Sequence, residues 1–163
     1  MIKRVFSLIL ALFWLSVFAF PAFATNTPQD VLTENGSVTY FSDGSSLTVS
    51  PAVLVAEQTL SRSAQTQTYS KTVTYKDSDG NVDWEYKLTA TFSYEYGVSS
   101  TCTKVSYTKT INDSGWSFSD GSATKSGNVA TGKGTFKYKV LFITTQTRNV
   151  NITLTCDKYG NVT

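Results

Sequence analysis

The stretch from Val82 to Tyr96 constrains the fold most, because apolar and polar residues alternate along it without a break. Successive side chains of a β-strand point to opposite faces, whereas a helix turns by roughly 100° per residue and would spread these apolar residues around its circumference. The alternation therefore predicts one long, half-buried strand. At about 3.4 Å per residue it would run on the order of 50 Å, so we also expect a bend or a bulge in it.

Shorter segments with strand patterns surround this stretch. We expect strands at 38–41 and 47–49, separated by the turn Ser42 to Ser45, and others at 105–111, 116–118, 136–142 and 150–156. Residues 52–60 fit either a strand or a helical turn. Turns are expected at 112–115, 119–121 and 125–128, and residues 147–149 lead into the last strand. The pattern predicts an all-β fold, either a single antiparallel β-sandwich (immunoglobulin-like) or a partly closed barrel, with about seven to nine strands.

The first residues have the composition of a secretory signal peptide. Lys3 and Arg4 precede an apolar run from Val5 to Phe20, and Ala22-Phe23-Ala24 has the small-x-small pattern of a cleavage site. We predict a signal peptide at 1–24, a flexible lead segment at 25–36 and the β-sandwich domain at 37–163. The chain is then secreted to the cell surface or the medium, and the alternative is an uncleaved membrane anchor.

Removal of this segment changes the charge of the protein. Two of the 14 basic residues lie in it, which leaves 12 against 12 acidic residues. A net charge of zero gives no support for a nucleic-acid partner or for binding to an anionic membrane.

The pair Asp79-Gly80 predicts the turn of the central hairpin. A two-residue turn at this point places Tyr75 opposite Trp84 and Val73 opposite Tyr86, with Lys76 opposite Asp83 on the other face. Lys71 would then lie opposite Leu88 on the apolar face, so we expect an edge or a bulge at that end of the strand.

Cys102 and Cys156 are the only cysteines of the chain. In an oxidising compartment a pair of cysteines indicates a disulfide, and we predict a Cys102–Cys156 bridge. Cys102 has the opposite strand parity to Val105 and Tyr107, so the bridge requires a bulge near Thr103. Two free thiols are the alternative.

The chain contains no histidine, which excludes Ser-His-Asp and Cys-His catalysis and most zinc sites. The acidic and amide residues Asp77, Asp79, Asn81 and Asp83 resemble a calcium loop in composition, but the hairpin turn accounts for them and we predict no metal and no cofactor. One carboxylate pair, Asp83 and Glu85, shares a strand face at roughly 7 Å, near the separation in inverting glycosidases. The alternative for that pair is a solvated face.

Trp116 is the candidate ligand-binding residue. An indole ring between Gly115 and Ser117 can stack on a sugar if it is exposed, whereas a buried core tryptophan is the commoner case.

Several short segments together resemble a group of small signal-bearing proteins of Firmicutes. The segments are 40–45, the Ser-Lys-Thr-Val-Thr-Tyr run from Ser70, the Trp84 strand, 101–103, 113–116, 125–128 and 154–156. The resemblance covers most of the chain after Ala24. It implies secretion, one β domain and paired cysteines, and it carries over no catalytic residue.

Three classes of function follow from these features. The first is a non-enzymatic extracellular binding module whose partner is a glycan, a cell-wall component or another protein. The second is a secreted toxin or bacteriocin-like protein, in which the apolar faces of the long hairpins meet lipid. The third is a carboxylate-dependent glycan hydrolase that uses Asp83 and Glu85.

Overall fold

The structure is a computed structural model, and it describes residues 29–32, 36–59 and 65–163. The described residues form ten strands and no helix. The strands are β1 (Gln29–Leu32), β2 (Val38–Tyr40), β3 (Ser46–Val49), β4 (Val53–Thr59), β5 (Gln65–Lys76), β6 (Val82–Glu95), β7 (Ser99–Ile111), β8 (Trp116–Ser126), β9 (Val129–Val140) and β10 (Ile143–Thr155). The predicted all-β class is confirmed, with more strands than expected.

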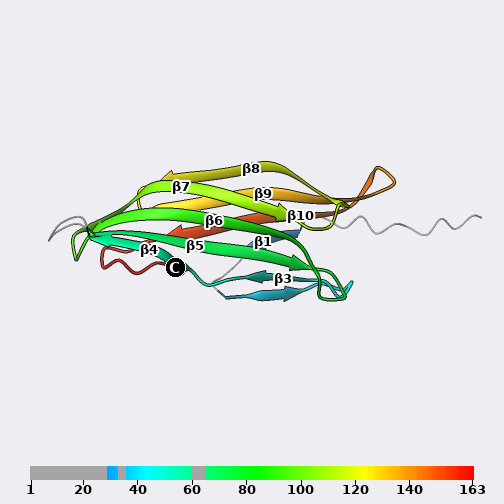
Figure 1. Cartoon of the computed structure of the whole chain (residues 1–163), viewed down its shortest axis with the longest axis horizontal. Coiled ribbons are helices and arrows are strands. Elements are labelled where there is room, and N and C mark those ends of the chain that lie inside the picture. Colours follow the sequence, from blue (N-terminus) through cyan, green and yellow to red (C-terminus); the bar gives the residue numbers. More distant parts are fainter. Residues whose placement is uncertain (1–28, 33–35, 60–64) are drawn as a thin grey trace, which may run out of the picture.

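Two sheets form the sandwich (Figure 1). One sheet has the order β1-β10-β9-β8, and the other has the order β2-β3-β5-β6-β7 with β4 also paired to β5. All pairs are antiparallel except β1 with β10. Consecutive hairpins build most of each sheet, and the described strands do not close into a barrel.

The core lies between the inward faces of the two sheets. The strand predicted at 82–96 is present as β6, which ends at Glu95, and its apolar residues from Trp84 to Tyr94 are buried, with Trp84 fully so, whereas Tyr96 lies beyond the strand and is exposed. Trp84 stacks on Phe136 of the opposite sheet, with 3.7 Å between the ring centroids, and on Tyr75 of its own sheet at 5.3 Å. Glycines on β9 make room for other rings, because a Cβ on Gly134 would lie 2.4 Å from the Phe118 ring.

The register of the β5–β6 hairpin is largely as predicted. Tyr75 pairs with Trp84 and Val73 with Tyr86, but Lys76 pairs with Val82 and not with Asp83. The turn is also longer than expected, since the Asp77 amide donates to the Asn81 carbonyl. The shift leaves Asp83 as an extra residue in β6, and this bulge buries its side chain, which accepts a hydrogen bond from Trp116.

Lys71 corrects a second detail of the prediction. It pairs with Leu88 as expected, but it is buried in the core rather than solvated at an edge. Its ammonium donates a hydrogen bond of 2.8 Å to the backbone carbonyl of Thr153 in the opposite sheet. Burial lowers the pKa of Lys71, because desolvation disfavours the charged form.

The lead segment expected at 25–36 contains a strand, and the stretch at 52–60, which fitted either a strand or a helical turn, also forms one. Residues 29–32, which have no period-two pattern, form β1 by pairing with the free edge of β10. The pairing uses backbone groups, which every residue supplies, so the pattern of side chains does not predict it. The stretch at 52–60 contains a strand, β4.

The predicted signal peptide, 1–24, and its cleavage site lie outside the described residues. In residues 29–32, 36–59 and 65–163 no helix is long and apolar enough to span a bilayer.

Candidate functional site

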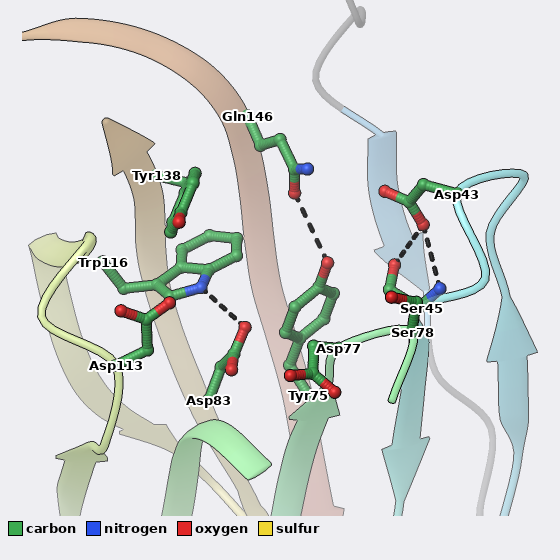
Figure 2. A pocket seen from close by; sticks show the side chains of 10 residues that line it. All are labelled: Asp43, Ser45, Tyr75, Asp77, Ser78, Asp83, Asp113, Trp116, Tyr138 and Gln146. Atoms are coloured by element: carbon green, nitrogen blue, oxygen red, sulfur yellow. Dashed lines mark hydrogen bonds between the residues drawn. The ribbon is translucent and has the colours of Figure 1, made fainter. Parts of the chain in front are cut away.

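A pocket of about 290 Å³ lies at one end of the sandwich (Figure 2). The β2–β3 turn, the β5–β6 turn, the β7–β8 turn and the base of the β9–β10 hairpin surround it. Its lining residues are Asp43, Ser45, Tyr75, Asp77, Ser78, Asp83, Asp113, Trp116, Tyr138 and Gln146. The lining thus combines three aromatic rings with four aspartates and contains no basic side chain.

Trp116, the candidate ligand-binding residue, lines this pocket but is only 5% exposed. Its indole Nε1 donates to Asp83 Oδ2 at 2.9 Å, and its ring packs edge-on against Tyr75 and Trp84. Trp116 is therefore a wall of the pocket and not an open stacking platform. The bulge in β6 makes this arrangement, because it turns the Asp83 carboxylate toward the indole.

The β7–β8 turn that precedes Trp116 is fixed by its own side chains and by the bulge. Asp113 Oδ1 accepts a hydrogen bond from the Gly115 amide at 2.8 Å. The Asp83 carbonyl accepts from the amides of Asn112 and Asp113 at 2.7 and 3.2 Å. A Cβ on Gly115 would lie 2.3 Å from the Tyr138 ring, so this position needs a glycine for Tyr138 to pack beside Trp116.

Arg148 does not line the pocket but contacts Tyr75 and Asp43, which do. Its side chain is buried, and its guanidinium lies 4.2 Å from the centroid of the Phe41 ring and 5.7 Å from that of Tyr75. One guanidinium nitrogen lies 3.6 Å from Asp43 Oδ2. Tyr75 also donates through its hydroxyl to Gln146 Oε1 at 3.3 Å, so both sheets hold this ring in place (Figure 2).

The carboxylates of the pocket differ in protonation behaviour. Burial raises the pKa of Asp83, and the negative charges of Asp113 and Asp77 raise it further against the hydrogen bond from Trp116. The Asn81 side-chain amide lowers the pKa of Asp77, and backbone amides of the turn add to this effect. Burial acts to raise the pKa of Asp43, but hydrogen bonds from Ser45 and the charge of Arg148 outweigh it and lower the value.

Asp83 and Glu85 do not form the carboxylate pair that simple alternation predicts. Asp83 points into the core toward Trp116, whereas Glu85 Oε1 accepts a hydrogen bond from Thr74 on the outer face of the sheet. The β6 bulge is the physical reason, since one extra residue reverses the side on which Asp83 emerges.

The residues that resemble a calcium loop form a hairpin turn. Asp77 accepts hydrogen bonds from the amides of Asp79 and Asn81 and from the Asn81 side chain. Among the described residues no cluster of three or more potential metal ligands is present.

The predicted Cys102–Cys156 disulfide is not present in the structure, where both cysteines are buried free thiols. The bulge expected at Thr103 is present, and it turns Cys102 inward. However, the backbone amides of Cys102 and Cys156 donate to successive carbonyls of the β8–β9 turn, Gly127 and Asn128. Each thiol lies 3.4 Å from a backbone carbonyl close to it in sequence, that of Lys104 for Cys102 and that of Asp157 for Cys156, rather than being bonded to the other thiol.

The tip of the β9–β10 hairpin is a second feature at this end of the molecule, and the sequence analysis missed it. In Figure 1 the orange loop between β9 and β10 extends beyond the neighbouring turns. Four consecutive apolar residues form it: Val140, Leu141, Phe142 and Ile143, which are 48%, 85%, 99% and 69% exposed. Leu141 and Phe142 have positive φ angles of 47° and 70°.

The sequence pattern predicts continuous strand through Phe142 and a second strand that begins after residues 147–149. The chain instead reverses at Leu141-Phe142, with no Gly, Asn or Asp to mark the turn. The only available signal was the run of consecutive apolar residues itself, which exceeds what one face of a strand can bury.

No protein-family model, curated protein or solved structure matches this chain.

Proposed function

We propose that the protein is an extracellular, non-enzymatic binding module, and that the pocket beside Trp116 binds a saccharide of a glycan or cell-wall polymer. The observation that carries the proposal is the joint lining of aromatic rings and aspartates in one preformed hollow. Aromatic faces pack against the apolar faces of a sugar ring, and carboxylates accept hydrogen bonds from its hydroxyls. Four aspartates without a basic residue also favour an ammonium group, so an amino sugar is the preferred ligand.

The size of the pocket supports a short ligand or the end of a longer one. A volume of about 290 Å³ is just below the range for small-molecule sites, roughly 300 to 1,000 Å³. The walls are held by hydrogen bonds that exist without a ligand, from Trp116 to Asp83 and from Tyr75 to Gln146. A preformed wall loses little conformational entropy on binding.

The test is a pull-down with insoluble cell-wall glycan and with chitosan, an amino-sugar polymer. Tyr138→Leu and Asp113→Asn are the pocket variants, because Asp113→Asn is isosteric, Tyr138→Leu keeps an apolar side chain beside Trp116, and both leave Trp116 itself unchanged. Tyr40→Ala is the matched control, since Tyr40 is 78% exposed and does not line the pocket. We expect binding by the wild type and the control and at least a tenfold loss in the pocket variants. Equal retention of all four proteins would contradict the proposal.

A carboxylate-dependent hydrolase is the second candidate, and one observation favours it. Asp83 has a raised pKa and lies near other carboxylates, which is the setting of a general acid. The partner would be Asp113 or Asp77 of the pocket rather than Glu85, which lies on the outer face. If Asp83→Asn abolishes release of reducing sugars while pull-down persists, the protein is an enzyme and the first proposal is wrong.

The toxin alternative requires a different structure. The apolar faces of the long hairpins pack against each other across the sandwich, so the sheets would have to separate before these faces could meet lipid. Release of a dye trapped in liposomes, accompanied by loss of the native near-UV circular dichroism, would favour this alternative.

A further inference from the structure

The β9–β10 tip, Val140 to Ile143, is the most exposed apolar surface at the pocket end, and nothing in the saccharide proposal uses it. Its side chains follow one another around a two-residue turn, so they point to several sides and form a convex apolar knob. A single exposed apolar residue is ordinary, but four in a row on a projecting hairpin mark an interaction site.

The backbone of the turn gives a second, independent observation. Bulky residues rarely adopt positive φ, and Asn-Gly would form the same kind of two-residue turn with less strain. Leu141 and Phe142 both have positive φ, while their side chains are 85% and 99% exposed. The strain is thus not offset by packing within the molecule.

From shape and charge we infer that the β9–β10 tip inserts into the surface of a lipid bilayer as a shallow, reversible anchor. A convex knob that is apolar on all sides needs a complementary pit in a protein partner, whereas fluid hydrocarbon adapts to it. Lys137 and Lys139 of β9 lie just before the tip, and the chain has no acidic residue between Val129 and Thr155. Lipid phosphates on the β9 side of the tip would therefore meet these two cationic side chains.

The distance between the basic residues and the tip agrees with a shallow insertion of the tip into the bilayer. Lys139 precedes Leu141 by two residues, or roughly 7 Å of strand, which matches the 5 to 10 Å at which interfacial apolar segments enter the headgroup boundary. Lys137 lies farther along the same face. The aspartates of the pocket are adjacent to Tyr138, so about 10 Å of strand separates them from the tip and Lys139 is closer to the bilayer.

The first experiment places a fluorescent reporter at the tip. Phe142→Trp adds an exposed indole, whereas Trp84 and Trp116 are buried and report little change of solvent. Vesicles of phosphatidylcholine, alone or mixed with phosphatidylglycerol, are added to the variant and to the wild type, prepared with the same N-terminus. We expect a shift of the Phe142→Trp emission to shorter wavelength and quenching by brominated lipid, with little change in the wild type.

The second experiment measures co-sedimentation with the same vesicles. Leu141→Asn with Phe142→Gly removes the apolar tip while favouring the turn, and it should lower the apparent partition coefficient at least tenfold. Tyr96→Asn with Val98→Asn is the matched control, because it removes two exposed apolar side chains from the turn at the other end of β6. Lys137→Gln with Lys139→Gln should abolish the preference for phosphatidylglycerol and leave binding to phosphatidylcholine.

Three results would overturn the inference. The first is an unchanged Phe142→Trp emission with vesicles of both compositions. The second is equal co-sedimentation of the tip variant and the wild type, which would assign any lipid binding to another part of the chain. The third is retention of the wild type, but not of the tip variant, by cell material from which detergent has removed the lipids. That result would identify a protein partner.

Discussion

At the residue scale, Lys71 is a cationic side chain that lies inside the core. It is 3% exposed, and a single backbone carbonyl, that of Thr153, accepts a hydrogen bond from its ammonium. A buried ammonium without a counter-charge is costly, and the structure responds by lowering its pKa. Its protonation is therefore linked to folding.

Replacement of Lys71 by Met should change how stability depends on pH. The unfolded chain titrates this lysine near its ordinary value of 10.5, and the folded chain titrates it below that value. Between the two values the unfolded state holds more protons, so this group makes the folded protein more stable as the pH rises. We would measure the free energy of unfolding in urea for the wild type and for Lys71→Met across this alkaline range. The value for the wild type should rise relative to that for Lys71→Met as the pH increases.

Lys87→Met is the control for this measurement, because Lys87 is an exposed residue of the same sheet. It should follow the wild type at every pH. Tyrosines also titrate at alkaline pH, and they affect all three proteins alike. A constant difference between Lys71→Met and the wild type would show that the lysine is solvated in the folded protein.

The two cysteines give a second prediction for single residues. Burial raises the pKa of Cys156 to about 11, and the nearby charge of Asp157 adds to the effect. Burial also raises the pKa of Cys102. Because the thiolate is the reactive form, both groups should react slowly with a thiol reagent in the native protein at neutral pH. Two thiols per chain should titrate after unfolding without reductant. Finding none would show that the two cysteines form a disulfide.

At the scale of single elements, the turns of the pocket end set the positions of the site residues. The β7–β8 turn presents Trp116, the β6 bulge presents Asp83, and the β9–β10 turn projects its apolar side chains. The last two depart from ideal strand geometry. Such departures concentrate where a protein uses its side chains for something other than packing.

Residues that favour positive φ in the β9–β10 turn should increase the stability of the folded protein. Leu141→Asn with Phe142→Gly places the preferred residues at two positions of positive φ. We expect stabilisation by about 1 to 2 kcal/mol in urea unfolding, since each strained non-glycine residue costs of order 1 kcal/mol or more. A destabilised variant would mean that Leu141 and Phe142 pack on the folded protein.

The β7–β8 turn should be sensitive to a single methyl group. Gly115→Ala places a Cβ where the Tyr138 ring now lies, 2.3 Å away, so the ring has to move. Overpacking of this kind costs typically about 1 to 3 kcal/mol. We expect that loss in urea unfolding, a changed near-UV circular dichroism and weaker binding at the pocket. Ser114→Ala is the control, because Ser114 is an exposed residue of the same turn, and identical near-UV spectra for Gly115→Ala and wild type would contradict the packing argument.

At the scale of the whole molecule, the two sheets bring together residues that are far apart in sequence. Tyr75 of β5 and Gln146 of β10 are 71 positions apart and are joined by a hydrogen bond. Lys71 and Thr153 are 82 positions apart. Pocket and core therefore depend on the same packing of sheet on sheet, and a protein that loses this packing should lose both.

The predicted processing of the chain belongs to this scale as well. Cleavage after Ala24 would leave a mature protein that begins at Thr25, five residues before Asp30 of β1. Intact-mass measurement of protein recovered from the culture medium should give the mass of residues 25–163. Recovery of the full-length mass from a membrane fraction would instead support an uncleaved anchor.

The sequence alone determined the all-β class, the central strand and most of the β5–β6 register, because alternation along a strand is a local property. It also placed the turn at 42–45, where Asp43 and Gly44 give an explicit signal. The bulge near Thr103 was expected only as a condition for the Cys102–Cys156 bridge, and it is present without that bridge. Each of these features depends on residues close together in the chain.

Only the tertiary structure decided the rest, and the reason is that a one-residue shift or a distant partner leaves no local pattern. The bulge at Asp83 places its side chain on the opposite face of the sheet from Glu85. There it accepts a hydrogen bond from Trp116, 33 positions away. The pairing of β1 uses backbone groups alone, and the turn at Leu141-Phe142 lacks every usual turn residue. The pocket exists because four such connections meet at one end of the sandwich, where packing between sheets, and not periodicity, sets which side chains face each other.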